Sequence, residues 1–222
     1  KNFYVKLIKM KKSLVIIPIK EISVAKSRLR KSFSKDIIRK LVIKLSSQLL
    51  DRVEIVLNEF ENKCDLAILT ECNEVKSLFK NRKIIYITPN KQGTLSEKIT
   101  FAQKWASEKK YKTICILPSD LANPTLEDLR DIIFFPIEEN MMVICSSYNF
   151  GTNALHISLP TNFRFSYGSN SFKKHLTVAK NNKIKIKILE LNSLLMDVDN
   201  EEDLIQLTNK LPDFMNNIVS HE

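Results

Sequence analysis

Three aspartates next to apolar segments are the residues in this 222-residue chain that most clearly suggest chemistry. Asp120 directly follows the apolar run at 113–118, and Asp197 and Asp199 lie two positions apart in a short apolar-acidic stretch. Side chains two apart on an extended chain point to the same side. Carboxylates of this kind hold Mg²⁺ in phosphoryl and nucleotidyl transfer. We therefore predict that the three acids are catalytic and bind magnesium; the alternatives are a helix cap at Asp120 and a turn before the last helix.

A basic segment follows the first apolar run, LVIIPI. It contains Lys20, Lys26 and Arg28, whose ammonium and guanidinium groups could hold the oxygens of a polyphosphate. A G-x-x-x-x-G-K-[ST] motif is lacking, which excludes a P-loop. Residues 1–44 carry a net charge of +12, against +10 for the whole chain. An exposed basic loop, or a nucleic-acid-binding module that uses this segment, is the alternative.

Glycine is scarce, with 3 residues in the chain, so each one marks a place where a side chain would not fit. Gly151 precedes Thr152, and we expect a turn there whose N–H groups and hydroxyl bind a small anion. Gly168 precedes Ser171, which should open a helix, and helix N-termini also attract anions. Two ordinary turns are the alternative.

The remaining reactive residues give weaker signals. His156 lies in an expected strand and should be structural, whereas His175 follows Ser171 by about one helical turn and could face the same site. The four cysteines form no C-x-x-C pair, and Cys115 and Cys145 should be buried thiols. We see no membrane-length apolar stretch and no signal peptide, and expect a cytoplasmic protein without a membrane partner.

Buried apolar strands that alternate with amphipathic helices must position these residues. Such alternation predicts an α/β fold of three layers with a mostly parallel sheet, in which ligands bind beyond the carboxyl ends of the strands. We expect a single domain over residues 1–222, with 1–12 as an N-terminal extension. The expected strands are 14–19, 65–70, 84–88, 113–118, 142–146, 154–158 and 184–191, and the expected helices are 34–53, 74–80, 95–109, 125–134, 171–180 and 201–210.

Five segments in this order resemble the 2-phospho-L-lactate guanylyltransferase family of coenzyme F-420 biosynthesis, including its phosphoenolpyruvate-using members. They read IPIK…AKSRL, LPSDL, GTNAL, RFSYGSNSFKKH and LLMDVDNEEDL, and the resemblance extends from Val15 to about Leu207. It implies a nucleotide-diphospho-sugar transferase fold of the glycosyltransferase-A kind. It also implies transfer of GMP from GTP to 2-phospho-L-lactate or phosphoenolpyruvate with release of pyrophosphate, and it suggests a homodimer.

The resemblance assigns roles to individual residues. It places Mg²⁺ on the three aspartates, the nucleotide at the basic loop and Gly93, and the phosphoacid at Thr152, Gly168 and Ser171. The chain departs from the family pattern at Phe150, where a second glycine is usual, and at Thr94 and Leu95, where Leu-Asn is usual. The nearest alternative is another nucleotidyltransferase, of the molybdopterin guanylyltransferase or sugar-phosphate type; we expect no nucleic-acid partner.

Overall fold

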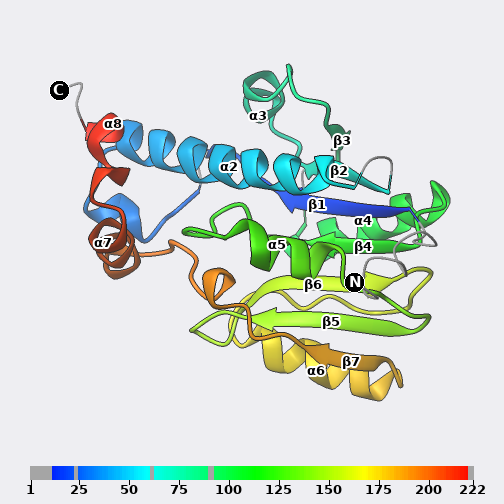
Figure 1. Ribbon diagram of the computed structural model, residues 1–222. Coiled ribbons are helices and arrows are strands. Elements are labelled where there is room, and N and C mark those ends of the chain that lie inside the picture. The colour runs from blue at the N-terminus through cyan, green and yellow to red at the C-terminus, as the bar shows by residue number, and fades with distance from the viewer. Residues whose placement is uncertain (1–11, 23–24, 61–62, 90–92, 220–222) are drawn as a thin grey trace.

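The computed structural model describes residues 12–22, 25–60, 63–89 and 93–219, and these build one seven-stranded sheet (Figure 1). The strand order is β3-β2-β1-β4-β6-β5-β7, and only β6 runs antiparallel to its neighbours. The α/β fold with a mostly parallel sheet is therefore confirmed. The strands are β1 (Ser13–Pro18), β2 (Cys64–Leu69), β3 (Ile85–Ile87), β4 (Thr113–Ile116), β5 (Met141–Ser146), β6 (Thr152–Ser158) and β7 (Lys185–Ile188).

Helices cover both faces of this sheet and make the three layers (Figure 1). One face packs against α2, α5 and α7, and the other packs against α4 and α6. The helices are α2 (Lys35–Asn58), α3 (Asn73–Leu78), α4 (Leu95–Glu108), α5 (Leu126–Ile133), α6 (Ser171–Asn181), α7 (Glu201–Lys210) and α8 (Asn216–Val219), with short 3₁₀ helices η3 (Leu29–Lys31), η4 (Asn192–Leu194) and η5 (Pro212–Phe214).

The central strands explain why the sheet forms between two helical layers. In β1, Val15 and Ile17 enter one apolar core while Leu14 and Ile16 enter the other, and all four are fully buried. This two-sided burial is typical of parallel strands and accounts for the continuous apolar run in the sequence. The long helix α2 presents its apolar stripe to the first of these cores.

One edge of the sheet collects the segments that we expected to carry chemistry. Parallel β1 and β4 end there, at Pro18 and Ile116, and each leads into a polar loop. Because β6 is antiparallel to β4, it begins at the same edge, with Thr152. The topology therefore brings three polar segments together that are far apart in the sequence.

Several local expectations need correction. Thr152 and Asn153 do not form a turn; they are the first residues of β6, which begins two residues before the expected strand. The helix expected at 125–134 is α5, with Thr125 as its N-cap, and the Asp128 carboxylate in its first turn accepts hydrogen bonds from Ser193. The strand expected at 184–191 is shorter, because β7 ends at Ile188. Beyond it, the Leu189 N–H still donates a hydrogen bond to the Ile144 carbonyl of β5.

Three further expectations concern two cysteines, the N-terminal segment and membrane-spanning helices. Cys115 and Cys145 are buried free thiols, as expected. Most of the expected N-terminal extension, residues 1–11, lies outside the described residues. Within the described parts of the chain, no helix is both long and apolar enough to cross a membrane.

Candidate active site

A cavity of about 320 Å³ opens at the edge where β1 and β4 end. The basic loop after β1 contributes Lys20, Lys26 and Arg28 to its wall. Asp120 and Asp199, which we call the acidic wall, also line the cavity, as does Thr152. Basic, acidic and hydroxyl groups thus surround one space, as the sequence predicted for a polyphosphate next to a metal.

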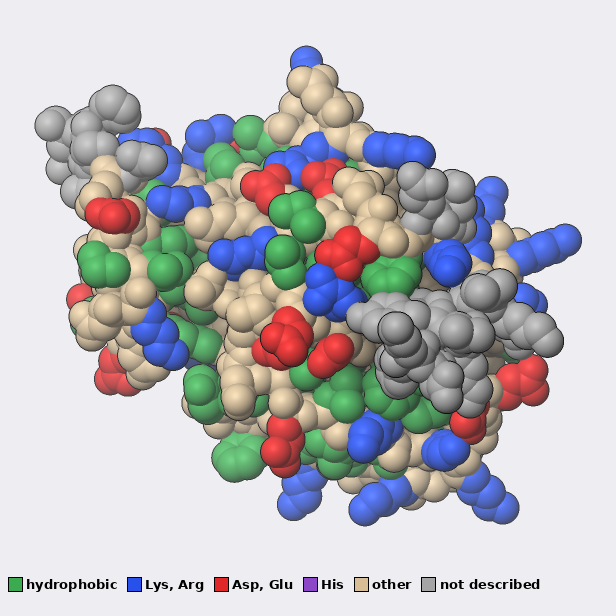
Figure 2. All heavy atoms as spheres, in the orientation of Figure 1, with side chains coloured by type: hydrophobic (Ala, Val, Ile, Leu, Met, Phe, Trp, Pro, Cys, Tyr) green, Lys and Arg blue, Asp and Glu red, His purple; other side chains and the backbone are tan. Residues whose placement is uncertain are grey.

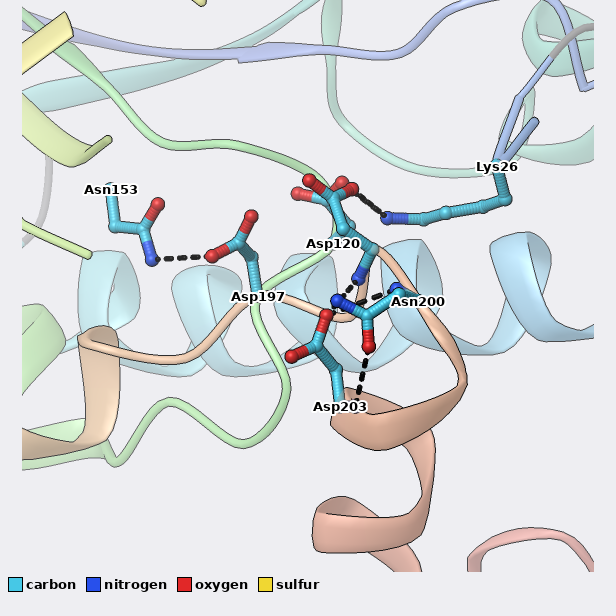
Figure 3. A network of polar contacts seen from close by, with 7 residues as sticks. Lys26, Asp120, Asn153, Asp197, Asn200 and Asp203 are labelled. Carbon is cyan, nitrogen blue, oxygen red and sulfur yellow. Dashed lines mark hydrogen bonds and ion pairs between the residues drawn. The ribbon is translucent and has the colours of Figure 1, made fainter. Parts of the chain in front are cut away.

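Lys26 links the basic loop to the acidic wall. Its ammonium lies 2.5 Å from Asp120 Oδ2 (Figure 3). It also lies 3.2 Å from Asp199 Oδ1. The Lys26 side chain is only 6% exposed. Burial opposes its charge, but the two carboxylates outweigh that effect and raise its pKa. Lys26 therefore stays cationic and neutralises part of the acidic wall.

Asp197 lies close to these carboxylates but is held by a different partner. Its Oδ1 accepts a hydrogen bond of 3.3 Å from Asn153 Nδ2, which also donates to the Leu194 carbonyl (Figure 3). Burial, together with the charges of Asp120 and Asp199, raises the pKa of Asp197 to about 6. Burial is the largest cause, and the repulsion by Asp120 and Asp199 outweighs the attraction of the Lys26 ammonium.

The first turn of α7 positions Asp199. Asn200 is the N-cap of α7, and its side chain accepts from the Asp203 N–H. The Asp203 carboxylate accepts in return from the N–H groups of Asp199 and Asn200, at 2.9 and 3.0 Å. This capping box holds the backbone at Asp199, so that its side chain reaches the cavity.

The donor chemistry of the three aspartates suits magnesium, because all of them offer carboxylate oxygens and one ammonium, that of Lys26, pairs with two of them. Their side chains are not arranged as a closed metal site: within the described residues, no three acidic, imidazole or thiol groups converge. The Lys26 ammonium lies between two of the carboxylates instead. A metal would require this ammonium to move, so magnesium binding remains a prediction.

The three residues that we predicted to bind the phosphoacid differ in how deeply they are buried. The Thr152 hydroxyl is bonded to His175 Nδ1 at 2.9 Å and accepts from Ser171 Oγ at 3.1 Å. Ser171 is 1% exposed and begins α6, as expected, but its hydroxyl lies behind Thr152. Gly168 is exposed, with φ +118°, and a Cβ there would meet no atom within 4 Å. The structure thus brings Thr152 and Ser171 together, with only Thr152 lining the cavity.

Of the predicted nucleotide residues, Lys20, Lys26 and Arg28 line the cavity and Gly93 does not. Gly93 has φ +127° and precedes α4, whose residues Leu95 and Ile99 do line it. A positive φ of this size is readily adopted only by glycine. Gly93 therefore permits the turn into α4 at the rim of the site.

Sequence reasoning missed three residues of this site. Asn153 orients Asp197, and Tyr167 lines the cavity. Ser46 on α2 lines it with a buried hydroxyl that has no hydrogen-bond partner among the described residues. Asn153 could have been found from strand alternation, because it must point to the face opposite Thr152. Ser46 gave no signal, since it lies inside a regular amphipathic helix.

Solved structures of other proteins share this fold. A protein from Desulfovibrio desulfuricans G20 described as a nucleotide-diphospho-sugar transferase has a TM-score of 0.68 at 16% identity, covering 93% of this chain and 91% of its own. A 4-diphosphocytidyl-2C-methyl-D-erythritol synthase from Anaerococcus prevotii has a TM-score of 0.62 at 11% identity, covering 93% and 99%. At this identity the likeness shows the fold, which the chain shares with these proteins.

Sequence comparison identifies the family. The model of the "Guanylyl transferase CofC like" family matches residues 13–210, and the chain belongs to this family. A phosphoenolpyruvate guanylyltransferase from Chloroflexus aggregans is 24% identical, covering 86% of this chain and 95% of the relative. A 2-phospho-L-lactate guanylyltransferase from Methanosphaera stadtmanae is 28% identical, covering 88% and 83%. A 3-phospho-D-glycerate guanylyltransferase from Colwellia psychrerythraea is 22% identical, covering 86% and 88%.

Proposed function

We propose that the protein transfers GMP from GTP to a three-carbon phosphoacid, 2-phospho-L-lactate or phosphoenolpyruvate, as a step of coenzyme F-420 biosynthesis. Membership of the guanylyl transferase family supports the nucleotide, and the names of the relatives support the acid. The observation that carries the proposal is that Lys26 and Arg28, Asp120 and Asp199, and Thr152 all line the same cavity.

The reaction joins two polyanions, and this chain offers the charges that such a reaction needs. A phosphate oxygen of the acid attacks the α-phosphorus of GTP, a new P–O bond forms, and the bond to the leaving pyrophosphate breaks. The nucleophile is already an anion near neutral pH, so no general base is required. Lys20, Lys26 and Arg28 would bind the triphosphate and oppose the charge that develops on pyrophosphate.

Magnesium would be held by Asp120, Asp197 and Asp199, and when bound it would supply positive charge to the phosphates of the nucleotide. Asn153 would orient Asp197 for this role, and the α7 cap would orient Asp199. Lys26 is the residue that must exchange partners, from the two carboxylates to the triphosphate. The exchange would be possible because the Lys26 ammonium contacts the two carboxylates and Lys26 also lines the cavity.

Pyrophosphate release tests the proposed reaction. Each of the four nucleoside triphosphates is combined with phospholactate, phosphoenolpyruvate, 3-phosphoglycerate or a sugar 1-phosphate, with and without Mg²⁺. We expect release with GTP and one or more of the three-carbon acids, only in the presence of Mg²⁺. Release with a sugar phosphate but with none of the acids would instead support the sugar-phosphate type of enzyme.

A homodimer is also part of the proposal, because the sequence resemblance suggests it. Light scattering after size exclusion measures the mass directly. A particle of twice the 25.7 kDa chain mass supports the dimer, and a particle of 25.7 kDa contradicts it.

A further inference from the structure

His175 lies behind the cavity and connects two segments of the proposed phosphoacid site. It is fully buried on α6, and both of its ring nitrogens are hydrogen-bonded. Nδ1 is bonded to the Thr152 hydroxyl at 2.9 Å, and Nε2 accepts from the Ser166 backbone N–H at 2.9 Å. With both nitrogens occupied inside the protein, the imidazole cannot contact a ligand directly.

The hydrogen bond from Ser166 determines which nitrogen carries the proton. A backbone N–H can only donate, so Nε2 must be the unprotonated nitrogen. Burial lowers the pKa of His175 to about 4, which makes the ring neutral near pH 7. The proton of the neutral ring therefore resides on Nδ1, and Nδ1–H donates to Thr152 Oγ1.

This tautomer determines what the Thr152 hydroxyl can still do. A hydroxyl oxygen has two acceptor positions and one hydrogen. The acceptor positions are filled by His175 Nδ1–H and by Ser171 Oγ–H, at 2.9 and 3.1 Å. In the part of the chain that the structure describes, no group accepts the Thr152 hydrogen. Since Thr152 lines the cavity, that hydrogen is left for an acceptor on a ligand.

The second nitrogen fixes another part of the same site. Through Nε2, His175 holds the backbone at Ser166, two residues before Gly168. The Tyr167 ring packs edge-on against the imidazole, with centroids 4.9 Å apart, and also lines the cavity. One imidazole thus links the start of β6 to the segment that precedes α6.

We propose that His175 is a positioning residue that makes the Thr152 hydroxyl a pure hydrogen-bond donor to an anionic oxygen of the three-carbon phosphoacid. The assignment of the ligand rests on the proposed function. The orientation of the hydroxyl rests only on the hydrogen bonds of His175, Ser166 and Ser171. A donor-only hydroxyl favours a carboxylate or phosphate oxygen over a ligand group that itself donates.

Steady-state kinetics of four variants tests this role. His175→Phe removes both nitrogen contacts, and we expect the KM of the phosphoacid to rise about tenfold with the KM of GTP unchanged. His175→Asn places an amide N–H near the position of Nδ1, and it should restore part of the loss. Thr152→Val removes the hydroxyl and should raise the same KM. Adding His175→Phe to Thr152→Val should change the KM by less than twofold, because the two residues act as one unit.

His156 provides a matched structural control. It is also fully buried and bonded on both nitrogens, to the Ile132 carbonyl and the Thr113 hydroxyl. Thr113 begins β4, at the end of the strand far from Asp120. We expect His156→Phe to lower the melting temperature without changing the KM of the phosphoacid. Equal effects of His156→Phe and His175→Phe on that KM would overturn the positioning role, as would additive effects in the double variant.

Nitrogen NMR of histidine-labelled wild-type protein provides a readout that requires neither turnover nor a variant that folds. We expect the His175 signals of a neutral ring with hydrogen on Nδ1 at pH 7. A charged ring, or hydrogen on Nε2, would overturn the inference even if the enzyme is fully active.

The results also distinguish failure of the inference from failure of the proposed function. If wild type shows the expected tautomer but none of the three-carbon acids supports pyrophosphate release, the proposed function fails and the ligand assignment fails with it. If wild type uses a three-carbon acid and His175→Phe leaves the KM of that acid unchanged, the inference fails while the proposed function stands.

Discussion

At the scale of single residues, Lys26 determines the state of the acidic wall. Its ammonium contacts Asp120 and Asp199 in a nearly buried position, and it has φ +53°, which is uncommon for a residue with a side chain. The strained backbone and the ion pairs both concern a residue that lines the cavity. Strain of this kind persists only where surrounding contacts hold it, and it is common at functional sites.

Removing one carboxylate from the acidic wall should separate catalysis from folding. We expect Asp120→Asn to lower kcat by at least about a hundredfold, because it removes a proposed magnesium ligand and a partner of Lys26. Asp131→Asn, an exposed change on α5, is the control and should leave kcat unchanged. Circular dichroism should show the same fold for both variants. Full activity in Asp120→Asn would contradict the assignment of this acid.

Arg28 should act on the nucleotide. It is exposed and lines the cavity, so the loss of its guanidinium in Arg28→Ala should weaken GTP binding about three- to tenfold, with a smaller effect on the phosphoacid. Lys31→Ala is the control, since Lys31 is exposed in the same segment but is not among the cavity residues. Calorimetric titration measures both ligands. A larger loss for the acid than for GTP would place the basic loop at the other substrate.

Buried histidines should make the protein less stable in acid. Burial lowers the pKa of His156 from 6.5 to about 4, so the unfolded chain takes up a proton first as the pH falls. The stability is complete above about pH 6.5 and decreases toward pH 4, and His156 should account for about 1 to 2 kcal/mol between pH 7 and 5. Urea unfolding at both pH values, in wild type and His156→Phe, measures this difference. An equal loss in both proteins would contradict it.

At the scale of elements, helix caps position the acids. Asn200 caps α7 directly after Asp199, so Asn200→Ala should cost about 1 kcal/mol of stability and also lower kcat. Ser34→Ala removes the N-cap of α2, whose Oγ accepts from the Ile37 N–H at 3.3 Å, and serves as a control. We expect similar losses of stability but a loss of kcat only in Asn200→Ala. Equal kcat values would show that the α7 cap does not position Asp199.

The antiparallel strand β6 is the element that completes the site. Its first two residues point to opposite faces, so that Thr152 contacts α6 and Asn153 reaches Asp197. In a fully parallel sheet this segment would begin at the other edge, away from Asp120. The reversal of one strand therefore places the residues predicted to bind the phosphoacid and those predicted to bind the metal at the same edge of the sheet.

At the scale of the whole molecule, the charge is unevenly distributed. The chain carries a net charge of +10, and on the face seen in Figure 2 acidic side chains gather near the centre with basic ones along the lower edge. The basic loop attracts a nucleoside triphosphate, and the acids beside it attract a metal cation. The same net charge also underlies the alternative of nucleic-acid binding.

Salt should distinguish these two consequences of the charge. Raising monovalent salt from about 0.1 M to 1 M shortens the Debye length from about 10 Å to about 3 Å. We expect the KM of GTP to rise about three- to tenfold, with kcat little changed, at constant Mg²⁺. RNA or DNA binding with a steep salt dependence, together with no turnover, would favour the nucleic-acid module instead. A KM that does not respond to salt would argue against the basic loop as the triphosphate site.

By itself, the sequence determined the order of strands and helices and the fold class, because burial on both faces of a strand or on one face of a helix leaves a direct periodic pattern. It also identified the segments after β1 and β4, and the family resemblance identified candidates such as Thr152 and Ser171. These predictions depend on local patterns and motifs that a single chain displays.

Only the tertiary structure decided how those residues meet. The pairing of β4 with antiparallel β6 placed Thr152 beside the acids, and the folding of the basic loop placed Lys26 between two carboxylates. The hydrogen-bond partners of His175 lie 9 and 23 positions away, and the side-chain partners of Asp120 and Asp197 lie 94 and 44 positions away. Contacts across such separations depend on packing of the complete sheet and its helices, which leaves no periodic trace in the sequence.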